Sequence, residues 1–367
     1  MVNTLEKNEK LLEEIDLHRT EFKTESYPMS VGELTNLYKS KEVQINPDFQ
    51  RFFRWTDTQK SRLIESFILG IPVPTIFVYQ REDGVWEVVD GLQRISTLMQ
   101  FMGLLEDKER LILQGTKYLP SLEGYVWEKK LPKDNVLPES IKLNLKRAKL
   151  NFSIILSDSG ENAKFDVFQR LNTGGSFASD QEVRNSVMIM INKPTYEWFK
   201  EISKDQNFLD CISIASRLID EQYPMELALR FISFRYFQYS QKKELRDFFD
   251  EVVEIILKNK QFPYEKYGDD FKKLFKLLNN LAGDGVFKRY SEGNFKGSFL
   301  ESAFEAVSIG IGTNLDTYKI PEDNQSLIDK IKGLHTQETF RTNSGSGSNA
   351  RNRVPKILPF AIEYFKI

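Results

Sequence analysis

Hydrophobic residues follow two different patterns along the chain. Up to about residue 180, amphipathic helical segments alternate with short apolar runs that have strand character. These runs cover residues 43–45, 75–79, 85–89 and 150–156. Beyond residue 180, apolar residues recur at helical spacing, as in 225–239, 245–257, 271–281 and 326–334. The pattern predicts an α+β fold, in which a mixed N-terminal domain precedes an all-helical C-terminal domain.

Helix-capping signals refine this organisation. Three pairs of residues have the spacing of a capping box, and Gly70 and Gly103 stand where glycines end helices. We predict a helical extension over 1–27, a first domain over 28–180 and a helical domain over 181–367. The three pairs are Ser30 and Glu33, Thr56 and Gln59, and Ser179 and Glu182.

The most informative segment is 86–98, where a strand-like run passes into a helical pattern through Asp90, Gly91 and Arg94. A helix N-terminus attracts anions, a glycine lets them approach the backbone, and a guanidinium adds charge-assisted hydrogen bonds. The junction is therefore a candidate phosphate site. The alternative is simple capping, because Asp90 and Gln93 are also three residues apart.

Neighbouring segments favour the phosphate site. In order, 45–55, 66–74, the junction itself and 168–175 resemble the ParB/sulfiredoxin-like N-terminal domain of GmrSD-type modification-dependent restriction enzymes and of the defence protein SspE. The motif of that family, Asp-Gly-Gln-Gln-Arg, corresponds here to residues 90–94, with Leu92 in place of the first glutamine. The resemblance covers roughly residues 28–190, and more loosely the helical remainder.

This resemblance implies a nucleotide-binding protein that hydrolyses nucleoside triphosphates in anti-phage or restriction-type defence. The implied catalytic residues are Asp90, Gln93 and Arg94; Asp90 would position water or a metal, for which Mg²⁺ is the candidate cofactor. No Walker-type glycine-rich loop is found in the sequence. The implied nucleotide or phosphate contacts are Arg51, Gly91, Arg94, Arg170, Asn172 and Gly174.

Simpler interpretations of these residues, and two rival functions, remain open. Residues 172–175 could be an ordinary helix end, and Arg51 could pair structurally. The chain could instead be a DNA-binding module that senses a modification and leaves cleavage to a separate effector subunit, or it could nick DNA directly at Asp90. We expect the chain to lack the His-Asn-His nuclease domain of similar proteins, because His18 and His335 are isolated and are interpreted as surface residues.

Composition limits the partners. The chain has 51 basic and 53 acidic residues and a net charge of −2, so any contact with DNA requires a local basic patch. Cys211 is its one cysteine, which fits a reducing compartment, and lies in an apolar run typical of a buried structural thiol. The sequence shows neither a signal peptide nor a membrane-spanning segment, so we predict a soluble, cytoplasmic protein without a membrane partner.

Two features of the C-terminal part invite a nucleic-acid interpretation. The Gly/Ser-rich stretch 343–348 is flanked by Arg341, Arg351 and Arg353, which could contact DNA, although the stretch could equally be a mobile connection. Aromatic residues around Arg230 could stack on bases, but their helical spacing favours core packing. On the same helix, the spacing of Glu226 and Arg230 predicts an intrahelical ion pair.

Overall fold

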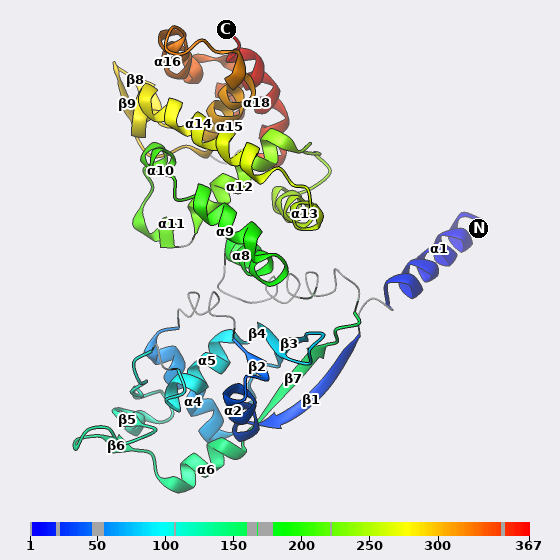
Figure 1. Ribbon diagram of the computed structural model, residues 1–367, viewed down its shortest axis with the longest axis vertical. Helices are drawn as coiled ribbons and strands as arrows, with labels where there is room; N and C mark the ends of the chain where they lie inside the picture. Colours follow the sequence, from blue (N-terminus) through cyan, green and yellow to red (C-terminus); the bar gives the residue numbers. More distant parts are fainter. Residues whose placement is uncertain are drawn as a thin grey trace. The chain divides into compact units, whose positions relative to one another are not determined.

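The computed structural model describes residues 2–19, 23–45, 55–105, 108–159, 167, 179–220, 222–345 and 349–367. The chain forms two compact units, residues 1–176 and 177–367 (Figure 1). The first is mixed α/β and the second is built from helices, as the sequence predicts. The α+β fold class is therefore confirmed.

The first unit contains a five-stranded mixed sheet with the order β1-β7-β3-β4-β2. Parallel pairing joins β7 to β3 and β4 to β2, whereas the other neighbours are antiparallel. The strands are β1 (Thr24–Ser30), β2 (Val43–Gln44), β3 (Ile76–Gln80), β4 (Trp86–Asp90) and β7 (Lys149–Ile155). The four predicted strands are thus present, each within one or two residues of its predicted bounds.

Strand β1 corrects the predicted helical extension over 1–27. Helix α1 (Val2–Arg19) is present, but residues 24–27 already belong to β1 and pair with β7. This strand has no alternating apolar pattern, because it lies at the sheet edge, contains Pro28 and is exposed over its first five residues. An edge strand tolerates both features.

Four helices share one hydrophobic core with the sheet (Figure 1). Their apolar residues pack together with Ile76, Val78 and Phe152, which are completely buried. The helices are α2 (Val31–Lys39), α4 (Asp57–Leu69), α5 (Leu92–Phe101) and α6 (Glu139–Arg147). Between α5 and α6 lie the one-turn helix η1 (Pro120–Leu122) and the small parallel pair β5 (Tyr125–Val126) and β6 (Asn135–Val136).

Helix ends follow the sequence signals closely. Full capping boxes form at Thr56 and at Ser179, and Gly70 ends α4 in the left-handed conformation with φ of 71°. At Ser30 half of the box forms: its hydroxyl accepts from the Glu33 N–H, but the Glu33 carboxylate accepts from the Tyr27 hydroxyl instead.

The second unit packs its helices around buried aromatic side chains. Phe231 and Phe234 are buried, which confirms the core interpretation of the aromatic run. Its elements are α8 (Asp180–Ile191), α9 (Lys193–Ile202), α10 (Gln206–Ile212), α11 (Ser216–Asp220), α12 (Tyr223–Tyr236), α13 (Leu245–Lys258), α14 (Tyr264–Ala282), η2 (Gly283–Gly285), β8 (Arg289–Ser291), β9 (Asn294–Lys296), α15 (Glu301–Asn314), η3 (Leu315–Thr317), α16 (Asn324–Gly333), η4 (Leu334–Thr336), α17 (Glu338–Asn343) and α18 (Ala350–Tyr364).

One short hairpin interrupts the helices of this unit. Strands β8 and β9 pair antiparallel across Glu292 and Gly293, both of which have positive φ. This is the two-residue turn that matches strand twist. The apolar pattern does not predict this hairpin, because three-residue strands are too short to establish an alternating pattern.

Candidate functional site

The predicted phosphate junction lies where β4 ends and α5 begins. Asp90 is the last residue of β4, Gly91 is the N-cap of α5, and Leu92 is its first residue. Within the part of the chain that the structure describes, no side chain caps this helix. The alternative interpretation, a capping box of Asp90 and Gln93, is therefore wrong, because each of these side chains is engaged elsewhere.

Gly91 is required by the geometry of this junction. Its φ of 98° lies in the left-handed region, which L-residues rarely adopt. A Cβ atom at this position would lie 2.9 Å from Cγ1 of Ile76, a fully buried residue of β3. The backbone thus turns sharply from strand to helix while staying in close contact with the neighbouring strand.

Arg94, in the first turn of α5, ties three segments together. Its Nη2 donates to Oδ2 of Asp90 at 2.6 Å, and its Nη1 donates to the carbonyl oxygens of Pro74 at 2.5 Å and Thr75 at 3.0 Å. Its side chain is 11% exposed and that of Asp90 is 31% exposed. Arg94 therefore fixes the orientation of Asp90, whose carboxylate remains accessible to solvent.

Gln93 connects the junction to the segment before α4. Its Oε1 accepts a hydrogen bond from the backbone N–H of Trp55 at 3.3 Å. This brings residue 55, and hence the end of the motif at 45–55, to the β4–α5 junction. The contacts from Pro74, Thr75 and Trp55 are backbone groups, so no residue type in the sequence could indicate them.

The structure brings together four of the predicted site residues, Asp90, Gly91, Gln93 and Arg94. The others in the first unit, Arg51, Arg170, Asn172 and Gly174, lie outside the described residues. No group of three or more His, Cys, Asp or Glu side chains placed to hold a metal is found in the described ranges.

The three C-terminal arginines lie in different environments. Arg341 is exposed on α17. Arg351 donates to Oε1 of Glu244 at 2.9 Å and to the carbonyl oxygen of Gln241 at 2.6 Å. Arg353 is buried, so its predicted role in DNA binding is wrong: its guanidinium is held by carboxylates inside the second unit.

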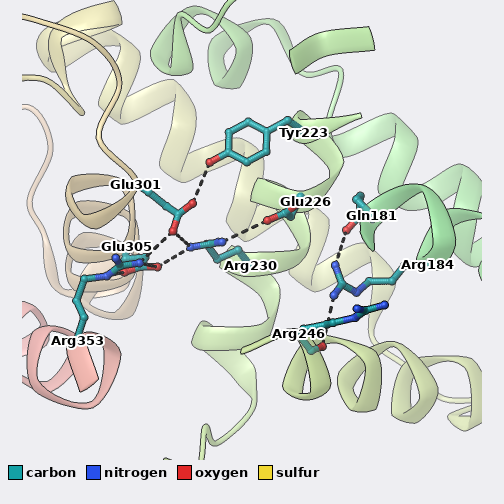
Figure 2. Close-up of polar contacts among 9 residues, drawn as sticks. All are labelled: Gln181, Arg184, Tyr223, Glu226, Arg230, Arg246, Glu301, Glu305 and Arg353. Carbon is teal, nitrogen blue, oxygen red and sulfur yellow. Dashed lines mark hydrogen bonds and ion pairs between the residues drawn. The ribbon is translucent and has the colours of Figure 1, made fainter. Parts of the chain in front are cut away.

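Those carboxylates belong to a buried charge cluster formed by Glu226, Arg230, Glu301, Glu305 and Arg353 (Figure 2). Nη1 of Arg230 lies 2.6 Å from Oε1 of Glu305, and Nη2 of Arg353 lies 2.8 Å from the same oxygen. The predicted pair of Glu226 and Arg230 is confirmed at 3.3 Å. The cluster joins α12, α15 and α18, and the apolar pattern gave no sign of it.

The histidines and the cysteine have clear environments. His18 is exposed, but His335 is half-buried, with its ring edge-on to Phe340 and its Nε2 buried without a partner among the described residues. The surface interpretation of His335 is therefore wrong. Cys211 is buried as predicted, and burial, followed by the charges of Asp210 and Asp205, raises the pKa of its thiol to about 12.

Comparison with known proteins agrees with the motif resemblance. Residues 31–189 match the family described as the N-terminal domain of the GmrSD restriction endonuclease, a span that includes the β4–α5 junction. No curated protein matches the chain. None of the described helices is long and apolar enough to cross a membrane. The match gives the first unit a restriction or defence context, and residues 31–189 belong to the GmrSD-type N-terminal domain family.

Proposed function

We propose that the first unit binds a nucleoside triphosphate at the β4–α5 junction and hydrolyses it in a restriction-type defence system. One observation carries this proposal: α5 starts at a left-handed glycine with no side-chain cap among the described residues, next to a solvent-accessible carboxylate and an arginine. Such a start combines backbone donors, a positive dipole end and a guanidinium, which together suit phosphate oxygens.

The Asp90–Arg94 pair suggests how the roles divide. A phosphate at the start of α5 would approach the Arg94 guanidinium in competition with Asp90, because both anions favour the same donors. Asp90 would then be available to orient the attacking water, assisted by Gln93. Phosphoryl transfer depends chiefly on such positioning and on charge neutralisation. A single carboxylate completed by phosphate oxygens and water also fits Mg²⁺, which keeps several waters when bound.

The remaining predicted contacts complete the proposed site. Arg51, Arg170, Asn172 and Gly174 would supply further phosphate or nucleotide contacts, in keeping with the ParB-like resemblance. We propose a partner subunit as the effector, because this mechanism gives the chain the role of a nucleotide-dependent sensor or switch.

A screen of ribo- and deoxyribonucleoside triphosphates for thermal stabilisation tests the proposal. A ligand present at about 100 times its dissociation constant adds roughly 2.7 kcal/mol to the free energy of unfolding. We expect at least one triphosphate to raise Tm in the wild type, and release of inorganic phosphate to accompany it. Failure of every nucleotide to stabilise the chain would contradict the proposal.

The rival functions give different results in the same protein. A module that only senses DNA would bind it with a steep salt dependence and release no phosphate in the presence of nucleotides. A direct nuclease would nick supercoiled plasmid in Mg²⁺ or Mn²⁺, and Asp90→Ala would abolish the nicking. Both alternative functions, DNA sensing and DNA nicking, are also compatible with a restriction context.

A further inference from the structure

The first unit also has a basic surface, formed by residues that follow the β4–α5 junction in the sequence. Between Trp127 and Lys149 the chain has seven basic and three acidic residues, although the whole chain has a net charge of −2. The basic residues lie in the loop 128–134, on α6 and at the start of β7. They are Lys129, Lys130, Lys133, Lys142, Lys146, Arg147 and Lys149, which we call the lysine face.

The loop that carries three of these lysines has a fixed shape. Oδ2 of Asp134 accepts from the backbone N–H groups of Lys130 at 2.8 Å and Leu131 at 2.7 Å. Both its oxygens also accept from Arg110, at 2.8 Å for Oδ1. The hydrogen bond from Arg110 outweighs the opposing effect of burial and holds the pKa of Asp134 far below its ordinary value. Asp134 thus stays ionised while Lys129, Lys130 and Lys133 are exposed around it.

Trp127 places the lysines of α6 beside this loop. The Nζ atoms of Lys142 and Lys146 lie 5.6 Å and 5.7 Å from the centroid of its ring. Trp127 directly precedes the loop, so its contacts with Lys142 and Lys146 place α6 next to the loop, and β5, β6 and α6 lie at one end of the first unit (Figure 1). Such cation–π contacts hold two like charges close together.

The acidic residues neutralise only part of this surface. Glu128 is exposed next to Lys129, Glu139 pairs with Lys142 at 2.7 Å, and the side chain of Asp134 is 5% exposed and paired with Arg110. Lys146, Arg147 and Lys149 are exposed together with the loop lysines. A polyanion that contacts this face therefore meets several exposed ammonium groups at once.

We propose that the lysine face binds the phosphate backbone of double-stranded DNA without reading its sequence. Lysine acts as a flexible point charge and does not form the rigid bidentate contacts of arginine. A lysine-rich surface therefore suits a repeating array of phosphates. This surface shares no residue with the proposed nucleotide site. It also provides the local basic patch that a chain with a net charge of −2 needs for DNA binding.

The test measures binding of a fluorescent duplex of mixed sequence to the full chain over a range of salt concentrations. The variant Lys129→Gln/Lys130→Gln/Lys133→Gln removes three loop charges. The matched control Lys260→Gln/Lys273→Gln/Lys276→Gln removes the same charge from exposed lysines of the second unit. Because each lost phosphate contact lowers the salt slope by about 0.9, we expect the loop variant to lower it by about 2 to 3 and to bind about tenfold or more weakly.

The control variant should keep the affinity and salt slope of the wild type. Thermal melting of each variant, and its binding of nucleotide, show whether the fold and the β4–α5 site are intact, so this test fails or succeeds separately from the nucleotide proposal. Equal weakening in both variants, or an unchanged loop variant, would overturn the assignment. Binding to anionic phosphatidylserine vesicles with none to DNA would overturn it too.

Discussion

Gly91 combines a left-handed backbone conformation with close contact to Ile76, and both disfavour any residue with a side chain. An alanine there would meet the cost of the left-handed backbone, about 1–2 kcal/mol, and in addition an overpacking cost of about 1–3 kcal/mol against Ile76. Gly84 is a matched control, because its φ is +83° and a Cβ there would meet nothing within 4 Å. We expect Gly91→Ala to lower the free energy of unfolding clearly more than Gly84→Ala in urea denaturation. Equal losses would show that the contact with Ile76 is relaxed easily.

Substitution of Asp90 separates a catalytic role of this residue from a structural one. Asparagine can still accept a hydrogen bond from Arg94, so Asp90→Asn should change stability by about 1 kcal/mol or less. It also removes a negative charge beside the proposed phosphate, so triphosphate binding should persist or tighten while phosphate release is lost. Calorimetry and a phosphate-release assay measure the two effects. Turnover at the wild-type rate in Asp90→Asn would remove this residue from the mechanism.

His335 gives the second unit a predicted dependence on pH. Burial, followed by the positive charge of Arg289, lowers the pKa of this histidine below its ordinary value of 6.5. The unfolded chain therefore takes up a proton before the folded chain does, and stability falls as pH decreases from about 6.5 towards the folded-state pKa. We expect His335→Phe to lose less Tm than the wild type between about pH 8 and pH 5.5. The same loss in both proteins would assign the acid sensitivity to other groups.

Among the elements of the second unit, α12, α15 and α18 depend on the buried charge cluster of Figure 2. Glu305 is fully buried and contacts both Arg230 and Arg353. Glu305→Gln would leave these two guanidinium groups under-compensated, at a cost of about 3–5 kcal/mol. Glu244→Gln removes an exposed partner of Arg351 and should cost about 1 kcal/mol or less. Denaturant titration of both variants tests this difference, and similar costs would mean that water reaches the cluster.

Helices and strands with a regular spacing of apolar residues could be predicted from the sequence. Elements held by backbone pairing or by a tight turn could not. The buried strands β3 and β7 and the capped helices α4 and α8 follow their local signals. Strand β1 is held by backbone pairing at the sheet edge, and the β8–β9 hairpin depends on a two-residue turn, so neither leaves an apolar pattern.

The candidate site shows the same division. The motif identified Asp90, Gly91 and Arg94, but two of the groups that hold Arg94, besides Asp90, are backbone carbonyl oxygens, which every residue has. Arg353 was predicted to lie on the surface because it follows a Gly/Ser-rich stretch that is flanked by arginines. Its guanidinium instead pairs with Glu301 and Glu305, about 50 positions earlier in the sequence. Pairing over such sequence distances leaves no local signal.

Across the whole molecule, two surfaces of the first unit carry proposed functions that respond to different variants. The β4–α5 junction depends on Gly91, Asp90 and Arg94, whereas the lysine face depends on exposed ammonium groups around Trp127. The second unit contributes a separate aromatic core and charge cluster. Loss of one proposed function with retention of the other would therefore show that the two surfaces act independently.

The most direct test of the nucleotide site is isothermal titration of a stabilising triphosphate into the full chain and its Arg94 variants. Arg94→Ala removes the guanidinium, whereas Arg94→Lys keeps the positive charge but cannot form a bidentate contact with phosphate. Both variants must first be shown to be folded, because Arg94 also holds Asp90 and the segment before β3. We predict binding weakened about tenfold or more in Arg94→Ala, or about 1.4 kcal/mol, with Arg94→Lys between it and the wild type. Wild-type affinity in a folded Arg94→Ala protein would contradict the account and place the ligand elsewhere.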